Sequence, residues 1–240
     1  MSTAISCGIR GGSGVVRKEV LAEGIELYLG DCLEVLPTLG RFDAVVTDPP
    51  YGIGQDGGRG HRLRSNARVQ EKKTWDKQRP AAQLFDLMRG LSDEQIIWGG
   101  NYFADLLPPK MGWLYWQKLI GGDFSDGELA WTSRDRALKE FSFRKTNSEM
   151  QHPTQKPVEV IRWCLGFLPD AVTILDPFMG SGTTGVAAVK LGRKFTGIEI
   201  DPGYFDIARK RIEAALKEPD LFIAPPKKAE QIALNMGVDE

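Results

Sequence analysis

The sequence is poor in the features that mark exported, metal-binding and membrane proteins. Its three cysteines, Cys7, Cys32 and Cys164, lie far apart and form no CxxC pair, which argues against a disulfide framework and a zinc cluster. No apolar run approaches the roughly 20 residues that a membrane-spanning helix needs. The first twenty residues also lack the apolar segment of a signal peptide. We therefore expect a cytoplasmic protein without a metal and without membrane association.

The sequence also lacks a strong charge of either sign. Its formal net charge is -1 at pH 7, so any basic surface must be local. Such a region is found in residues 53–80, where glycines are followed by many arginines and lysines and few apolar residues. This composition predicts a mobile basic loop. A chain of 240 residues is long enough for one α/β domain with a substantial core.

Apolar runs with strand character alternate with amphipathic stretches along most of the chain. Strands are predicted over residues 25–31, 42–48, 95–100, 112–118, 128–133, 138–145, 172–176 and 195–200, and helices over 32–39, 81–91 and 157–167, with two more after residues 182 and 201. Residues 128–133 and 138–145 read as a hairpin-like antiparallel edge. The pattern predicts a glycine-rich flexible arm over 1–23, one α/β domain over 24–217, and a loosely attached tail over 218–240.

A glycine-rich turn follows the predicted strand that ends at Asp176. Gly180 and Gly182 occupy the turn, and glycine permits conformations that let a ligand lie against the backbone. No GK[ST] sequence follows, and the spacing differs from GxGxxG, so a phosphate site is disfavoured. The next strand ends at Glu199, where nucleotide-binding folds place a carboxylate for ribose hydroxyls. Together these features predict a ligand with a ribose and no phosphate; the alternative is a plain tight turn and a solvated acid.

The stretch VVTDPPYGIG ends another predicted strand with Asp48, Pro49, Pro50 and Tyr51. Proline fixes its own φ angle and has no N–H, so its carbonyl is held rigidly with no competing donor beside it. The stretch therefore presents two acceptors and an aromatic ring at a strand end. The alternative is a turn that merely ends the strand, with Tyr51 packed on its neighbours.

The order of these motifs resembles that of the S-adenosylmethionine-dependent DNA amino-methyltransferases. DPPY at 48–51 is similar to their catalytic motif, and DPFMGSGTT at 176–184 is similar to their cofactor motif. Because the catalytic motif comes first, the resemblance is to the permuted β class of adenine-N6 and cytosine-N4 enzymes. GDCLEVL, HPTQKP and GIEIDPGYFDIARKR add three further matches in order. The resemblance implies a Rossmann-like α/β fold with a mostly parallel, seven-stranded twisted sheet, helices on both faces and an antiparallel edge strand.

The resemblance implies roles for the residues of both motifs. Asp48 and the Pro49 carbonyl would accept hydrogen bonds from the target amine, and Tyr51 would stack on a base flipped out of the duplex. For S-adenosylmethionine, Glu199 would bind the ribose hydroxyls, Asp31 the adenine amino group, and Cys32 would supply nearby backbone. The remaining cofactor residues implied by the resemblance are Asp48, Thr154, Lys156, Asp176, Phe178, Gly180, Ser181, Gly182, Thr183 and Thr184. Lys156 and Thr154 are candidates for the methionine carboxylate.

The expected partner is DNA. Basic side chains of the loop would neutralise phosphates, with Arg59, Arg62, Arg64, Arg68, Lys72 and Lys73 as the named candidates. The resemblance implies a target-recognition segment over residues 134–150, which is shorter here than is usual in the family and so indicates a very short site or little specificity. The resemblance implies a restriction-modification or phage setting and pairing of chains into a homodimer.

The choice between adenine and cytosine as the target base rests on the resemblance of the DPPY motif alone. DPPY is more usual in adenine-N6 members of the family, so we predict N6-methyladenine as the product. Three alternatives stay open: cytosine-N4 methylation, amine methylation on RNA, and a non-catalytic nucleic-acid-binding protein that retains the fold.

Overall fold

The fold is described from a computed structural model of the 240-residue chain. It describes residues 7–11, 14–53, 79–119, 125–144 and 155–218. No helix in these ranges is long and apolar enough to cross a membrane. The segments named in the sequence analysis that lie outside them include most of the basic loop and the C-terminal tail.

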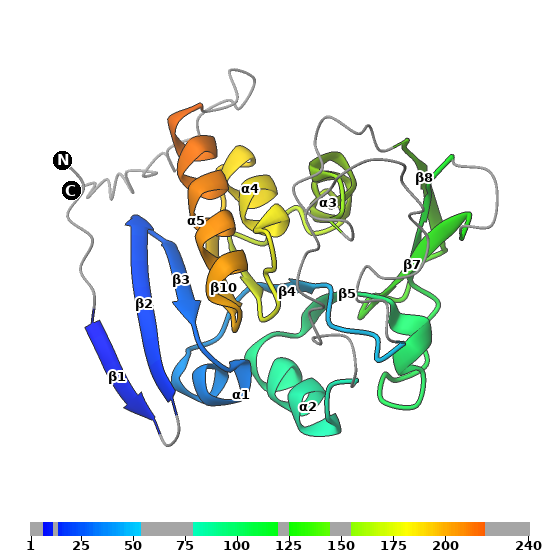
Figure 1. The fold of residues 1–240 in the computed structure, drawn as a ribbon. Coiled ribbons are helices and arrows are strands. Elements are labelled where there is room, and N and C mark those ends of the chain that lie inside the picture. The colour runs from blue at the N-terminus through cyan, green and yellow to red at the C-terminus, as the bar shows by residue number, and fades with distance from the viewer. Residues whose placement is uncertain (1–6, 12–13, 54–78, 120–124, 145–154, 219–240) are drawn as a thin grey trace, which may run out of the picture.

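One mixed sheet forms the centre of the molecule, with helices on both of its faces (Figure 1). Among the described residues it has ten strands in the order β1-β2-β3-β10-β9-β4-β5-β7-β6-β8. The strands are β1 (Cys7–Gly11), β2 (Gly14–Ala22), β3 (Ile25–Leu29), β4 (Ala44–Thr47), β5 (Glu94–Trp98), β6 (Trp113–Gln117), β7 (Gly127–Thr132), β8 (Lys139–Ser142), β9 (Thr173–Asp176) and β10 (Lys194–Glu199). The helices are α1 (Cys32–Val35), α2 (Ala82–Leu91), α3 (Val158–Leu165), α4 (Thr183–Lys190) and α5 (Pro202–Lys217), with 3-10 turns η1 (Leu36–Thr38) and η2 (Gly100–Phe103).

The expected fold class is confirmed. The five central strands β3, β10, β9, β4 and β5 run parallel, and β7 pairs antiparallel with both β5 and β6. The described sheet contains three strands more than the expected seven, because β1 and β2 extend one side and β8 the other. The antiparallel strand β7 lies inside the sheet, whereas β1 forms an antiparallel edge through its pairing with β2.

The prediction of a flexible arm over residues 1–23 is wrong for residues 7–11 and 14–22. These residues form β1 and β2, and β2 pairs antiparallel with both β1 and β3. The many glycines and serines before residue 15 concealed a short alternating pattern in which Val16 is buried against the sheet. The Arg17 guanidinium lies over the ring of Phe205, 4.8 Å from its centroid, so β2 is also fastened to α5.

The expected hairpin between residues 128–133 and 138–145 is also wrong. β7 pairs with β5 and β6, whereas β8 lies on the far side of β6 and runs parallel to it. Strand character is a local property of the sequence, but the choice of a neighbour depends on distant residues.

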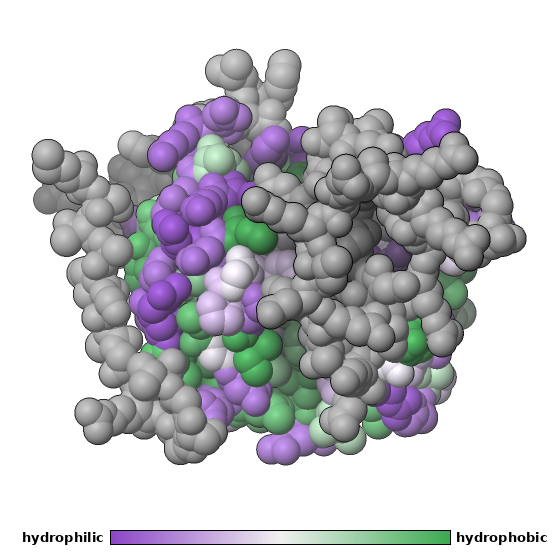
Figure 2. Space-filling model, in the orientation of Figure 1, coloured by the Kyte–Doolittle hydropathy of each residue, from purple (hydrophilic) through white to green (hydrophobic). Residues whose placement is uncertain are grey.

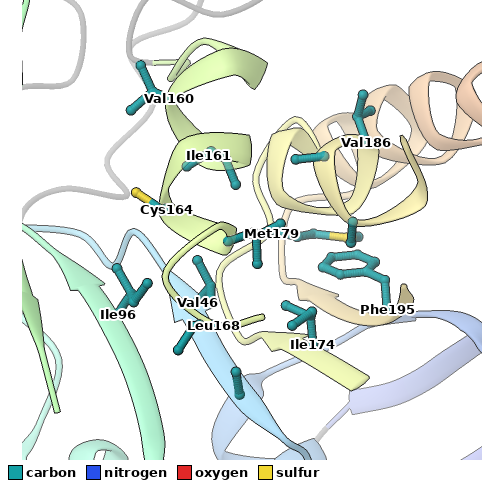
Figure 3. Packing of buried hydrophobic residues seen from close by; sticks show 14 of the residues in the cluster. Val46, Ile96, Val160, Ile161, Cys164, Leu168, Ile174, Met179, Val186 and Phe195 are labelled. Atoms are coloured by element: carbon teal, nitrogen blue, oxygen red, sulfur yellow. The ribbon is translucent and has the colours of Figure 1, made fainter. Parts of the chain in front are cut away.

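Side chains that alternate along the central strands build two cores. On one face Val46, Ile96 and Ile174 pack against α3, α4 and α5, as Figure 3 shows for part of this core. On the other face Val45 and Ile97 pack against α1 and α2. Near-continuous apolar strands are typical of parallel sheets covered on both faces. The outward surface over α5 is mainly hydrophilic (Figure 2), as expected for a helix that buries only one side.

The chain changes direction between β9 and β4. From β9 it continues through α4 to β10 on one side, whereas from β4 it continues through α2 to β5 on the other side. Ligands of open α/β sheets bind beyond the carboxyl ends of the strands at such a switch point. The fold therefore places the ends of β4 and β9, Thr47 and Asp176, at the expected site.

The amino ends of the same two strands are joined by Asp43. One of its carboxylate oxygens, Oδ2, accepts hydrogen bonds from the backbone N–H groups of Val172 (2.9 Å) and Thr173 (2.7 Å) and from the Thr173 hydroxyl (2.8 Å). The hydrogen bonds from Thr173 hold the pKa of Asp43 below its ordinary value, although partial burial opposes this. The side chain is exposed, so its contribution to stability is modest.

We predict that Asp43→Ala lowers the free energy of unfolding by about 1 kcal/mol at neutral pH. Because the folded-state pKa is depressed, this contribution is present above the unfolded pKa of about 4 and is lost as the pH falls through the folded value. Urea unfolding at neutral and acidic pH measures both effects. The control is Asp93→Ala, whose carboxylate is exposed and pairs with Arg41, and which should change stability by less than about 0.5 kcal/mol. Equal losses for both variants at neutral pH would contradict the prediction.

Candidate functional site at the carboxyl edge of the sheet

Four acidic residues lie at the carboxyl ends of four neighbouring parallel strands. Asp31 follows β3, Glu199 ends β10, Asp176 ends β9, and Asp48 follows β4. The sequence analysis named all four, and the sheet order brings them to one edge. The backbone N–H of Gly30 donates to the Glu199 carbonyl at 2.9 Å, which joins the first two strand ends.

Asp31 begins α1 as its N-cap. Its Oδ1 accepts a hydrogen bond from the backbone N–H of Leu33 at 2.8 Å, which satisfies one of the free donors of the helix end. The neighbouring Cys32 is half-buried, and burial together with the charge of Asp31 raises the pKa of its thiol to about 12. Cys32 is therefore a neutral thiol at neutral pH, and only its backbone and its apolar surface are suited to a ligand.

Glu199 holds the glycine turn. Its Oε2 accepts a hydrogen bond from the Gly180 N–H at 2.9 Å, and its Oε1 accepts one from the Asp201 N–H at 2.8 Å. Burial raises the pKa of this carboxyl to about 7, although the two backbone donors oppose the shift. Glu199 thus changes its charge within the range of physiological pH.

The two glycines of the turn face different surroundings. Both have positive φ, +51° at Gly180 and +79° at Gly182. A Cβ at Gly182 would lie 2.9 Å from the Cα of Ala208 in α5, so this glycine allows close packing of turn and helix. Among the described residues, a Cβ at Gly180 would meet nothing nearer than the Phe178 carbonyl at 4.0 Å, so none of them fills the space beside this glycine. Only Gly180 is thus placed for a ligand to approach its backbone.

The hydroxyl residues of the turn are bound within the protein. Ser181, Thr183 and Thr184 are buried. The Arg211 guanidinium of α5 donates to the Ser181 carbonyl and hydroxyl and to the Thr183 hydroxyl. Phe178 is half-buried and packs against the core formed with α1 and α2. These contacts connect the glycine turn to α5 and to the core beside α1 and α2.

Asp176 joins the glycine turn to the neighbouring strand end. The side chain is 2% exposed, and its Oδ1 accepts hydrogen bonds from the Thr47 hydroxyl (2.7 Å) and the Phe178 N–H (3.1 Å). Burial raises the pKa of Asp176 to about 6, while the hydrogen bonds from Thr47 and Thr184 oppose the shift. The backbone ladder between β4 and β9 ends at Val45 and Leu175, so the Thr47–Asp176 hydrogen bond continues the connection beyond it.

The DPPY turn presents Asp48 and Tyr51 beside this connection. The Tyr51 hydroxyl donates to Asp48 Oδ1 at 2.6 Å. The Tyr51 ring stacks on Tyr102 with a centroid distance of 4.8 Å and an interplanar angle of 16°. A Cβ at Gly99 would lie 2.1 Å from this ring, so the close approach requires glycine there. Burial, with the charges of Asp48 and Glu128, raises the pKa of Tyr51 well above 10, which keeps the phenol a hydrogen-bond donor.

Lys156 lies at the DPPY turn. Its ammonium pairs with Asp48 Oδ2 and with Glu128 Oε2 at 3.0 Å, and it lies 3.3 Å from the Tyr51 hydroxyl oxygen. The polar partners found for it among the described residues are these three. The geometry thus places Lys156 at the DPPY turn, and its expected role toward the methionine carboxylate stays a prediction.

Sequence reasoning missed two members of the site. Glu128 is the second residue of β7, and Tyr102 belongs to η2. The available signal for Glu128 was a carboxylate at the start of an otherwise apolar strand. For Tyr102 the sequence holds no comparable signal, because its partner Tyr51 lies on another strand end.

Several predicted site residues lie outside the described part of the chain. They are Thr154, Arg59, Arg62, Arg64, Arg68, Lys72 and Lys73. The recognition segment over 134–150 is described only as far as residue 144. Within that part Arg134 pairs with Glu94 at 2.7 Å, and Arg136 lies over the Phe167 ring. DNA contact by these residues stays a prediction.

Comparison with known proteins finds similarity to DNA methyltransferases. Residues 109–210 match the N6_N4_Mtase family, described as DNA methylase. The Type II methyltransferase M2.DpnII of Streptococcus pneumoniae is 36% identical over 146 residues, which cover 59% of this chain and 50% of that protein. The Type II methyltransferase M2.LlaDCHI of Lactococcus lactis subsp. cremoris is 36% identical over 145 residues, or 58% and 49% of the two chains. The chain spans about half the length of these curated relatives.

Solved structures share the fold. The structure of an M1.HpyAVI–SAM complex aligns with a TM-score of 0.58 at 20% identity and covers 78% of this chain and 98% of its own. The PvuII DNA methyltransferase, titled cytosine-N4-specific, aligns with a TM-score of 0.53 at 16% identity and covers 80% and 89%. At these identities the likeness concerns the fold. The resemblance to the DNA amino-methyltransferases expected from the sequence is confirmed.

The two glycines of the turn lead to a prediction about stability. Gly182→Ala should lower the free energy of unfolding by about 2–3 kcal/mol, because it adds a methyl group against Ala208 and a left-handed strain. Gly180→Ala is the matched control, since it has the same left-handed strain but no described residue fills the space beside it, and should cost about 1 kcal/mol. Urea unfolding of both variants without ligand measures the difference. A larger loss for Gly180→Ala would contradict the described packing.

Proposed function

Because the chain resembles the DNA amino-methyltransferases in sequence and in fold, we propose that it methylates the N6 amine of adenine in DNA with S-adenosylmethionine as the methyl donor. The observation that carries this proposal is the Thr47–Asp176 hydrogen bond, which joins the strand end that presents Asp48 to the strand end that begins the glycine turn. A methyl acceptor and a methyl donor bound at these two ends would lie side by side.

The residues of the glycine turn fit an adenosyl cofactor. None of the described residues fills the space beside Gly180, and Glu199 offers a carboxylate to ribose hydroxyls. Asp31, one strand further along, is suited to the adenine amino group. When bound, S-adenosylmethionine supplies an electrophilic methyl group on a sulfonium. The turn binds and orients this group, and such positioning accounts for much of the catalysis of a group transfer between two bound reactants.

The DPPY turn fits an exocyclic amine. The lone pair of such an amine is delocalised into the ring, so the nitrogen is a poor nucleophile until its hydrogens are held by acceptors. Asp48 and the Pro49 carbonyl are the acceptors we propose. The target base must leave the duplex to reach them. Tyr51 would stack on that base, and its stack with Tyr102 supports the ring from the protein side.

The basic loop begins and ends beside this site. A Cβ at Gly52 would lie 2.8 Å from the backbone nitrogen of Arg79, so the two flanks of residues 54–78 are neighbours next to Tyr51. The Arg79 guanidinium is fixed by Asp105 and by the Tyr102 carbonyl. We propose that the loop contacts DNA phosphates around the flipped base. A homodimer is a separate proposal, which light scattering of the purified chain would test.

We predict that the wild-type protein forms N6-methyladenine in unmethylated plasmid DNA and that Asp48→Ala lowers the rate by about 100- to 1000-fold. Removal of Asp48 takes away one of the two acceptors for the amine and so slows the transfer step. The proposed acceptor role concerns the amine and not the cofactor, so cofactor affinity should change by less than about threefold. Nucleoside mass spectrometry measures the product, and calorimetry measures cofactor binding.

The control for this experiment is Asp86→Ala, an exposed acid paired with Arg89, which should retain full activity. N4-methylcytosine as the product would overturn the choice of base. Absence of product on DNA but methylation of RNA would overturn the substrate. Absence of product on both would favour a non-catalytic binding protein.

We further predict that cofactor affinity weakens as the pH falls below about 7. The raised pKa of Glu199 means that its carboxylate gains a proton in this range, and a protonated carboxyl accepts hydrogen bonds from ribose hydroxyls less well. Glu199→Gln should bind S-adenosylmethionine about tenfold more weakly at a pH of about 8, and the difference from wild type should shrink as the pH falls towards about 6. Calorimetry across this range checks the prediction. A difference that stays constant between these pH values would show that Glu199 does not change its charge there and would contradict the prediction.

A further inference from the structure

Four charged side chains form a cluster on one side of the DPPY turn. They are Asp48, Glu128, Lys156 and Lys118, called the charged cluster below. The Lys156 ammonium pairs with Asp48 and Glu128, and Glu128 also pairs with Lys118 through its other oxygen at 2.6 Å. Two carboxylates thus face two ammonium groups, and the charges balance within the cluster.

Lys156 is at the centre of this cluster and is buried. Its side chain is 5% exposed, and its ammonium lies 4.9 Å from the centroid of the Trp98 ring. An ammonium has three N–H donors. The three polar partners of Lys156, namely Asp48, Glu128 and the Tyr51 hydroxyl oxygen, match this number. These contacts fix the position of the Lys156 ammonium group.

The surroundings keep Lys156 charged. Burial lowers its pKa, but the carboxylates of Asp48 and Glu128 outweigh burial, and the pKa lies above its ordinary value. Burial likewise opposes the charge of Glu128, yet Lys156 and Lys118 hold the pKa of that carboxyl at about 2. Burial raises the pKa of the Cys164 thiol in α3, although the charge of Lys156 opposes this shift, so the thiol is neutral.

The cluster restrains Asp48 from two sides. Lys156 binds Oδ2, and the Tyr51 hydroxyl donates to Oδ1. A carboxylate with both oxygens held cannot rotate freely. It can accept about four hydrogen bonds in all, so acceptor capacity is left for the hydrogens of an amine.

We propose that Lys156 is a positioning residue for methyl transfer, which holds the Asp48 carboxylate ionised and aimed at the target amine, while Glu128 holds Lys156. This inference rests on the proposed function of the site. It differs from the role in binding the methionine carboxylate that the resemblance implies for Lys156. The two roles predict opposite effects on cofactor affinity and on the rate of the methylation step.

The experiment measures both quantities for Lys156→Met, Lys156→Arg and Glu128→Gln. Calorimetry with S-adenosylmethionine gives the dissociation constant, and single-turnover methylation of plasmid DNA at saturating cofactor gives the rate. For Lys156→Met we expect a dissociation constant within about threefold of wild type and a rate about 100-fold lower, as for a misplaced reacting group. Lys156→Arg keeps the positive charge, and its rate should be about tenfold higher than that of Lys156→Met.

Glu128→Gln tests the outer part of the cluster. It keeps the size of the side chain and removes its charge, so Lys156 is held less firmly and the rate should fall about tenfold with unchanged cofactor affinity. If Lys156→Met does not fold, Lys156→Arg and Glu128→Gln carry the test through the same two measurements. The matched control is Lys110→Met, which removes a lysine paired with Asp135 near the opposite end of β6 and should leave both quantities unchanged.

Two results would overturn the inference alone. In the first, Lys156→Met weakens cofactor binding tenfold or more while its rate at saturating cofactor equals that of wild type, which would assign Lys156 to the cofactor. In the second, wild type methylates DNA and the Lys156 and Glu128 variants do so at the wild-type rate. A wild-type protein that methylates neither DNA nor RNA would instead overturn the proposed function, and the inference with it.

Discussion

The pairing of β4 with β9 is the constraint on which the rest of the site depends. The two strands lie about 130 positions apart in the chain, as the separation of their hydrogen-bonded residues shows, and their pairing brings the DPPY turn next to the glycine turn. Asp43 fastens their amino ends, two backbone pairs follow, and Thr47 fastens the carboxyl ends to Asp176. A register shift of one residue would exchange the faces of every side chain. Asp48 would then turn away from the glycine turn, and both cores would lose their apolar side chains.

Much of the fold could be predicted because its signals are local. The unit from β9 through α4 to β10 follows directly from an apolar run, a glycine turn and an amphipathic stretch. The sequence analysis did not predict β2, because its alternation is short and follows a glycine-rich stretch, and its strand conformation depends on pairing with β1 and β3. The pairing of β8 with β6 was not predicted for a related reason. A sequence shows that a segment is suited to a sheet, but the partner is chosen by packing between distant segments.

The site likewise has residues that the sequence predicts and partners that it does not. Asp48, Tyr51, Gly180 and Glu199 could be named from the sequence, because each belongs to a motif at a strand end. The partners that set their chemistry could not be named. The raised pKa of Glu199 comes from burial, and the fixed orientation of Asp48 comes from a lysine more than a hundred positions away. Motifs identify the groups that act, whereas burial and contacts across the sheet determine their charge and direction.

The nearness of Gly52 and Arg79 has a consequence for how such a protein diversifies. Because the chain leaves and re-enters the sheet at neighbouring points, the segment between them is attached to the fold like an insert with adjacent ends. Insertions at such sites leave the surrounding strands in place. The segment can therefore be lengthened, shortened or exchanged with little effect on the charged cluster or on the pairing of β4 with β9. Residues 54–78 can therefore vary in evolution while the strand ends around them are retained.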